Sequence, residues 1–113
     1  MKGKIGLEEH FAIDETISDS AGFLDDRVWP ELKENLLDFR GKRIGIMDQY
    51  HIQMMILSLN APAIQAIHEP KRAIEISLRS NDLLAEEVNR LPDRFAGLAA
   101  LPMQSPEVAI EEL

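Results

Sequence analysis

A carboxylate and an imidazole lie close together near the N-terminus, as Glu8 and His10. Apolar residues alternate with small or charged ones over positions 4–11, a pattern that predicts a short strand ending in polar residues. Alternate residues of a strand point to the same side, so Glu8 and His10 would face one way and Glu9 the other. One oxygen and one nitrogen donor together suit Zn²⁺ or Mn²⁺. The alternative is a solvated or hydrogen-bonded pair, since metal sites are recognised by full ligand sets.

The elements that must position this pair follow an alternating order of strands and helices. We expect strands at 4–11, 52–59 and 95–101, and helices at 27–39 with a continuation to 47, at 70–91 and at 105–113. Such alternation predicts an α/β fold class with parallel strands, all within one domain spanning residues 1–113. The apolar run 52–59 predicts a strand covered on both faces. The segment 12–26, rich in Asp, Ser and Gly, predicts a long loop.

Polar or proline-containing turns occur at the end of each predicted strand. They are Glu8-Glu9-His10, Ser58-Leu59-Asn60-Ala61-Pro62 and Pro102-Met103-Gln104. In a βα barrel, the carboxyl ends of the strands carry the catalytic residues. The position of Glu8 and His10 therefore favours the metal site over the solvated pair.

Five short motifs occur in the order in which a known enzyme family carries them. They are Glu8-Glu-His-Phe-Ala12, Asp19-Ser-Ala-Gly-Phe23, Leu57-Ser-Leu-Asn-Ala-Pro62, Asn81-Asp-Leu-Leu-Ala-Glu86 and Pro92-Asp-Arg-Phe-Ala-Gly97. Together they resemble the γ-resorcylate (2,6-dihydroxybenzoate) decarboxylases, which are similar to the 2,3-dihydroxybenzoate and aminocarboxymuconate-semialdehyde decarboxylases of the amidohydrolase superfamily. The resemblance covers essentially all of the chain. It implies a TIM (β/α)₈ barrel of which this chain would be the first three βα units, truncated within its last helix.

The resemblance also implies a chemistry. The parent enzyme would decarboxylate ortho-hydroxybenzoates such as 2,6-dihydroxybenzoate without oxidation, using one divalent metal, Zn²⁺ or Mn²⁺, held in part by Glu8 and His10. The other ligands and a proton-donating Asp would lie beyond the last residue, so we expect no catalytic residue in this segment and no turnover by the chain alone. His10 favours the resorcylate branch, because the 2,3-dihydroxybenzoate branch often has Ala there. The full-length parent would be a homo-oligomer.

Three further residues carry specific expectations. The resemblance implies that Phe23 forms an apolar wall of the substrate pocket, although a loop Phe packed on the surface is the alternative. Asn60 could donate to a substrate oxygen, or it could stabilise the Asn-Ala-Pro turn. His51 stands where relatives usually carry Gly, which predicts a positive φ angle and a structural role.

The composition of the chain limits its possible binding partners and its location in the cell. Twenty acidic and twelve basic side chains give a formal charge of −8, and no basic cluster is present to track phosphates. We therefore expect neither nucleic acid nor membrane as a partner, and the resemblance implies a small aromatic acid as substrate. The chain has no Cys, and its first residues lack the apolar run of a signal peptide, so we expect a cytoplasmic protein.

Two other functions stay open. The same barrel and metal could hydrolyse a ring or a lactone, because most of the groups that would clamp a substrate lie outside this segment. The chain could also be a stand-alone binding or assembly module without catalysis, for which its length of 113 residues is the support.

Overall fold

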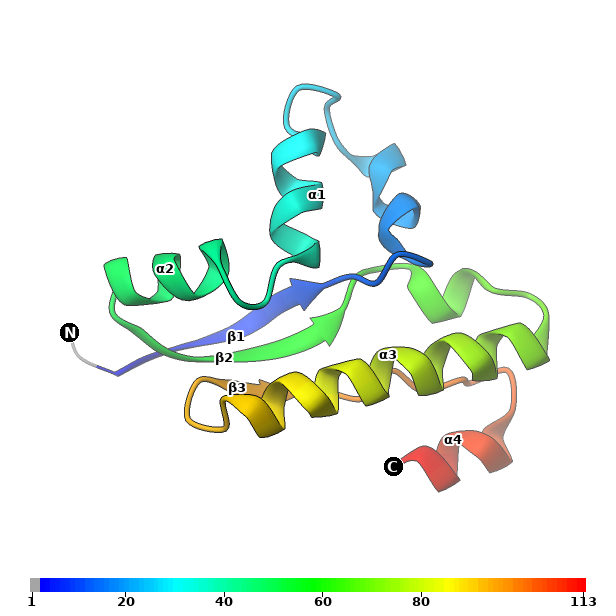
Figure 1. Cartoon of the computed structure of the whole chain (residues 1–113). Coiled ribbons are helices and arrows are strands. Elements are labelled where there is room, and N and C mark those ends of the chain that lie inside the picture. The colour runs from blue at the N-terminus through cyan, green and yellow to red at the C-terminus, as the bar shows by residue number, and fades with distance from the viewer. Residues whose placement is uncertain (1–2) are drawn as a thin grey trace.

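The computed structural model describes residues 3–113 and shows a small parallel sheet with helices packed around it (Figure 1). The strands are β1 (Lys4–Phe11), β2 (Ile52–Leu59) and β3 (Phe95–Gly97). The α-helices are α1 (Trp29–Leu37), α2 (Lys42–Gln49), α3 (Pro70–Arg90) and α4 (Pro106–Glu112), and the 3₁₀ helices are η1 (Ile17–Phe23) and η2 (Ala63–Ala66). Among the described residues, no helix combines the length and the hydropathy that a membrane span requires.

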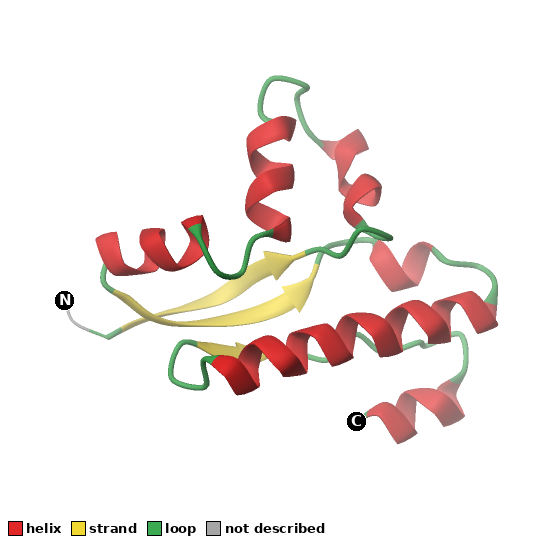
Figure 2. Ribbon diagram, in the orientation of Figure 1, coloured by secondary structure: helices red, strands yellow, loops and turns green. Residues whose placement is uncertain are grey.

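The strands form one parallel sheet in the order β1-β2-β3, so β1 and β3 are its edges. In Figure 2, α1 and α2 lie on one side of β1 and β2, and α3 runs along β3. The predicted α/β fold class with parallel strands is confirmed.

The core lies against one face of this sheet. On β2, Met55 and Leu57 are buried and join a cluster with residues of α2 and α3, whereas their neighbours Met54 and Ile56 are only half-buried. The prediction that this strand is covered on both faces is therefore wrong for the described chain, because the helices close only one face. Apolar side chains stay exposed near the sheet edges, including Leu7 on β1 and Leu98 after β3.

Three phenylalanines join the edges of the sheet through the core. The rings of Phe11 and Phe39 have their centroids 5.4 Å apart, and those of Phe39 and Phe95 are 6.3 Å apart in an edge-to-face arrangement. Such aromatic pairs add stabilisation beyond the area they bury. Phe39 lies between α1 and α2, so this connection is fixed to both β1 and β3.

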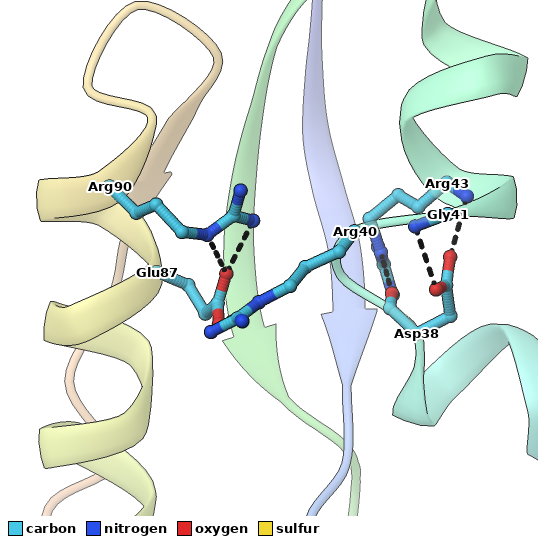
Figure 3. Close-up of polar contacts among 6 residues, drawn as sticks. All are labelled: Asp38, Arg40, Gly41, Arg43, Glu87 and Arg90. Atoms are coloured by element: carbon cyan, nitrogen blue, oxygen red, sulfur yellow. Dashed lines mark hydrogen bonds and ion pairs between the residues drawn. The ribbon is translucent and has the colours of Figure 1, made fainter.

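The connection between α1 and α2 separates the helix expected at 27–39 from its expected continuation to position 47. Asp38 ends α1, and its carboxylate accepts hydrogen bonds from the backbone N–H groups of Gly41 (3.0 Å) and Arg43 (2.7 Å), which begin α2 (Figure 3). Burial raises the pKa of Asp38, but the backbone N–H groups of Arg43, Gly41 and Arg40 and the charge of Arg43 together lower it by more, so this pKa lies below its usual value. A side chain that bonds the backbone locally competes with a continuous helix, and this one starts a new helix.

A buried carboxylate ties α3 to this same connection. Glu87 of α3 is 5% exposed, and Figure 3 shows it between two arginines. Its Oε1 atom accepts from Arg40 Nη2 at 2.6 Å and its Oε2 atom from Arg90 Nη2 at 2.6 Å. Burial raises the pKa of Glu87, but the two guanidinium groups lower it by more, so the carboxylate is held below its usual pKa.

Other elements differ from the sequence prediction in their extent. The segment 12–26 is not a bare loop, since it contains η1. β3 ends at Gly97 and not at position 101, because the backbone of Ala100 is hydrogen-bonded to a side chain and not to a neighbouring strand. Asn81 Nδ2 donates to the Ala100 carbonyl oxygen at 2.9 Å, and Asn81 Oδ1 accepts from the Ala100 N–H at 2.8 Å. Met103, in the turn after β3, is 61% exposed.

Candidate metal centre and adjoining cavities

β1 contains a β-bulge that includes Glu8, the first candidate ligand. Gly6 pairs with Met55 and Glu9 with Leu57, so β1 has an additional residue between these two pairs. Bulges of this kind occur beside active sites, where they change the direction of a side chain. Strict alternation along 4–11, on which the sequence prediction depended, is therefore interrupted just where Glu8 lies.

The structure nevertheless brings Glu8 and His10 to one cavity. This cavity, which we call the β1 cavity, has a volume of about 320 Å³ and is bordered by Glu8, Glu9, His10, Asn35 and Arg43 together with apolar residues. Glu9, predicted to point away from the pair, also borders it, because the bulge breaks the alternation. Both Glu8 and His10 are exposed to solvent there.

A second cavity joins His10 to the two predicted substrate-binding residues. This η1 cavity has a volume of about 400 Å³ and is bordered by His10, Phe23, Asn60 and Pro62, with Leu32 and Leu36 among the apolar residues that it shares with the β1 cavity. Phe23 ends η1 and is 76% exposed, with its side chain at the border of the cavity. Its role as a wall of a substrate pocket stays a prediction.

The side chain of Asn60 is buried, and it holds the η1 segment. Its Nδ2 donates to the carbonyl oxygen of Thr16 at 2.9 Å and to Ser20 Oγ at 2.8 Å, and its Oδ1 accepts from Thr16 Oγ at 2.8 Å. These bonds run to Thr16 and Ser20 and not to the Asn-Ala-Pro turn that the sequence alternative invoked. Donation from Asn60 to a substrate stays a prediction, and it would require one of these two Nδ2 bonds to break.

The imidazole of His10 has a side-chain partner that sequence reasoning missed. Ser58 lies opposite His10 in the pairing of β1 with β2, and its Oγ is 3.0 Å from His10 Nδ1. The motif Leu57-Ser-Leu-Asn-Ala-Pro62 contained Ser58, but only the strand register shows which side chain it meets. Within residues 3–113, no other hydrogen bond of the ring is present.

Arg43, which the sequence analysis also did not single out, fixes the backbone at the same point. Its Nη2 atom donates to the carbonyl oxygens of His10 at 2.8 Å and Asn35 at 3.0 Å, and its Nε donates to that of Asp38 at 2.8 Å. Burial lowers the pKa of the Arg43 guanidinium, and the charges of Glu9 and Asp38 oppose that shift. The guanidinium of this α2 residue therefore connects the end of β1 to the C-terminal end of α1.

The donor set fits part of a divalent metal centre. Glu8 supplies a carboxylate and His10 an imidazole whose Nε2 is unoccupied by any hydrogen bond within residues 3–113. No group of three or more His, Cys, Asp or Glu side chains able to hold a metal occurs in that part of the chain. Catalytic and structural zinc centres use three or four protein ligands, so this pair needs further ligands to make a site.

Comparison with known proteins relates the whole chain to one group of enzymes. It is 59% identical over 113 residues to the γ-resorcylate decarboxylase of Rhodococcus jostii (strain RHA1), matching 100% of this chain and 34% of the relative. The matched part is the N-terminal third of such enzymes. No protein-family model matches the chain.

Solved structures give the same relationship in three dimensions. The chain is 58% identical to a dihydroxybenzoic acid decarboxylase from Polaromonas sp. JS666 with bound manganese and the inhibitor 2-nitroresorcinol, with a TM-score of 0.95 over 99% of this chain and 34% of that one. It is 56% identical to a 2,6-dihydroxybenzoate decarboxylase complexed with 2,6-dihydroxybenzoate, with a TM-score of 0.95 over 99% of this chain and 35% of that one. The chain thus spans about a third of the length of the proteins that it matches. Its predicted resemblance to the γ-resorcylate decarboxylases is confirmed.

Proposed function

We infer that this chain supplies the first part of the active site of a metal-dependent, nonoxidative decarboxylase of ortho-hydroxybenzoates such as 2,6-dihydroxybenzoate. In this proposal Glu8 and His10 are two of the ligands of a divalent metal, and Phe23 is an apolar wall for the aromatic ring. The rest of the barrel, with the remaining ligands and the general acid, would come from polypeptide outside these residues.

The observation that carries the proposal is the meeting of Glu8 and His10 at one cavity at the carboxyl end of β1. That end is where the barrel architecture delivers its catalytic side chains. Support also comes from the similarity of the entire chain to decarboxylases, one of which contains manganese. Manganese is therefore the ion we favour over zinc.

The substrate would occupy the space that the two cavities share at His10. A divalent ion there would orient the carboxylate and the ortho hydroxyl of the substrate and stabilise their charge. Phe23, with Leu32 and Leu36, would offer an apolar surface to the ring, and an apolar wall with a few polar groups is typical of small-molecule sites.

The 113-residue chain alone should not catalyse the decarboxylation. Its two candidate ligands are short of the three or four that such centres use, and both are open to solvent. Water that has free access would also screen the charge of the site. The function belongs to a complete barrel that contains these residues.

The proposal can be tested in a chimaera in which this chain replaces the matching N-terminal third of the Rhodococcus jostii relative. The resulting chimaera is assayed for release of CO₂ from 2,6-dihydroxybenzoate and for hydrolysis of a panel of lactones. We expect decarboxylation that needs added Mn²⁺ and that is lost on His10→Ala. A chimaera that folds but hydrolyses lactones without decarboxylating would overturn the proposal in favour of hydrolysis.

A further inference from the structure

The geometry points to Ser58 as the positioning residue for His10, one that holds the imidazole so that Nε2 is the nitrogen presented to a divalent metal. This inference rests on the proposed role of His10 as a ligand. It adds Ser58, a residue of β2 that is not itself a proposed ligand, to the residues that would form the metal centre.

The first support is the register of the sheet. His10 pairs with Ser58 across β1 and β2, and paired residues of adjacent strands place their side chains on the same face. Leu57, the neighbour of Ser58 on β2, is fully buried on the helix-covered face. Ser58 is therefore held on the other face, where its Oγ reaches His10 Nδ1 at 3.0 Å.

The second support is the chemistry of a neutral imidazole, which has one N–H and one free lone pair. A metal needs the lone pair, so the nitrogen that does not bind metal must carry the hydrogen. If Nδ1–H donates to Ser58 Oγ, the lone pair is on Nε2 and faces outward. The reverse bond, from the Ser58 hydroxyl to Nδ1, would put the hydrogen on Nε2 and block it. Groups that accept the second ring N–H fix the tautomer and the ring orientation of metal-binding histidines, and the Ser58 hydroxyl can act as such an acceptor.

The third support is that the backbone of His10 is already fixed by another residue. Arg43 Nη2 donates to the His10 carbonyl oxygen at 2.8 Å. With the backbone held, rotation of the ring is the freedom that remains, and the bond to Ser58 restrains it. Arg43 and Ser58 thus act on different parts of the same residue.

The test uses the chimaera described above and measures its dissociation constant for Mn²⁺ by competition with a chelator. We expect Ser58→Ala to weaken Mn²⁺ binding by about ten- to one-hundred-fold, as loss of such a partner usually does. Ser58→Thr keeps the hydroxyl and should restore most of the affinity. Because the defect lies in affinity, excess Mn²⁺ should restore most of the decarboxylation by Ser58→Ala. Ser105→Ala is the matched control, since Ser105 at the start of α4 makes no capping hydrogen bond through its side chain.

The outcomes separate this inference from the proposed function. If Mn²⁺ binds to the Ser58→Ala chimaera as tightly as to the parent, the inference is wrong and the ligand assignment stands. If Ser58→Thr is as weak as Ser58→Ala while both melt at the parental temperature, the hydroxyl has no positioning role and the inference also fails. If the parental chimaera binds no Mn²⁺ at all, both the inference and the proposed function are overturned.

Discussion

A Cβ atom placed on Gly97 of β3 would lie 2.6 Å from Cδ2 of Leu84 in α3. Real side chains almost never approach so closely, and Leu84 is 4% exposed, so it has little room to move. The absence of a side chain at Gly97 is therefore what lets α3 pack against the short third strand.

Gly97→Ala should destabilise the chain by about 1–3 kcal/mol, because overpacking forces buried side chains to shift. Leu84→Ala should cost about 2–5 kcal/mol by leaving a cavity. The double variant should cost clearly less than both changes together, since each relieves the defect of the other. Urea unfolding of the four chains measures this coupling. Strictly additive costs would show that the two residues do not limit each other.

Glu87 gives the stability a dependence on pH. Its carboxylate is buried between Arg40 and Arg90, and its pKa in the folded chain lies below the usual value of about 4.3. The stabilisation is therefore complete above the unfolded-state pKa and is lost as the pH falls through the lower folded-state pKa.

Glu87→Gln should accordingly lower the free energy of unfolding at neutral pH by about 1–3 kcal/mol, with the difference shrinking in acid. Thermal or urea unfolding between neutral and acidic pH measures this. Glu86→Gln, which changes the neighbouring exposed carboxylate, is the control and should have little effect at any pH. A constant difference across the pH range would mean that the charge of Glu87 is not what stabilises α3.

Arg43 should be sensitive even to replacement by Lys. A single ammonium cannot reproduce the fork of donors that reaches the carbonyl oxygens of His10, Asn35 and Asp38. We expect Arg43→Lys to cost about 1–3 kcal/mol and to speed amide hydrogen exchange over positions 8–12. Arg27→Lys is the matched control, because Arg27 is exposed and, within residues 3–113, pairs only with the nearby Asp25. We expect it to change neither the stability nor the amide exchange measurably. Unchanged exchange in Arg43→Lys would show that β1 holds His10 without this guanidinium.

The sequence predicted the elements whose signals are local. β1 and β2 have the predicted limits, because their apolar runs end in polar or proline-containing turns. α3 begins at Pro70 and ends beside Leu91-Pro92, where proline restricts the backbone. His51 has a φ of 58°, which confirms the positive angle expected before β2.

The features that the sequence did not predict depend on contacts between distant residues. The bulge at Glu8 is visible only once β1 is paired with β2. The bonds from Asn60 to Thr16 and from Ser58 to His10 join residues more than forty positions apart, and no periodicity encodes such pairs. The residue types of the candidate site were thus predictable, while the groups that hold them in place were not.

The most direct measurement is the manganese content of the chimaera, purified with its Glu8→Gln, His10→Gln double variant and analysed by atomic emission. The proposal predicts manganese at the level of the unmodified Rhodococcus jostii relative in the chimaera and its loss in the double variant, with both proteins folded. Equal manganese in both proteins would contradict the proposal, because the metal would then be held without Glu8 and His10.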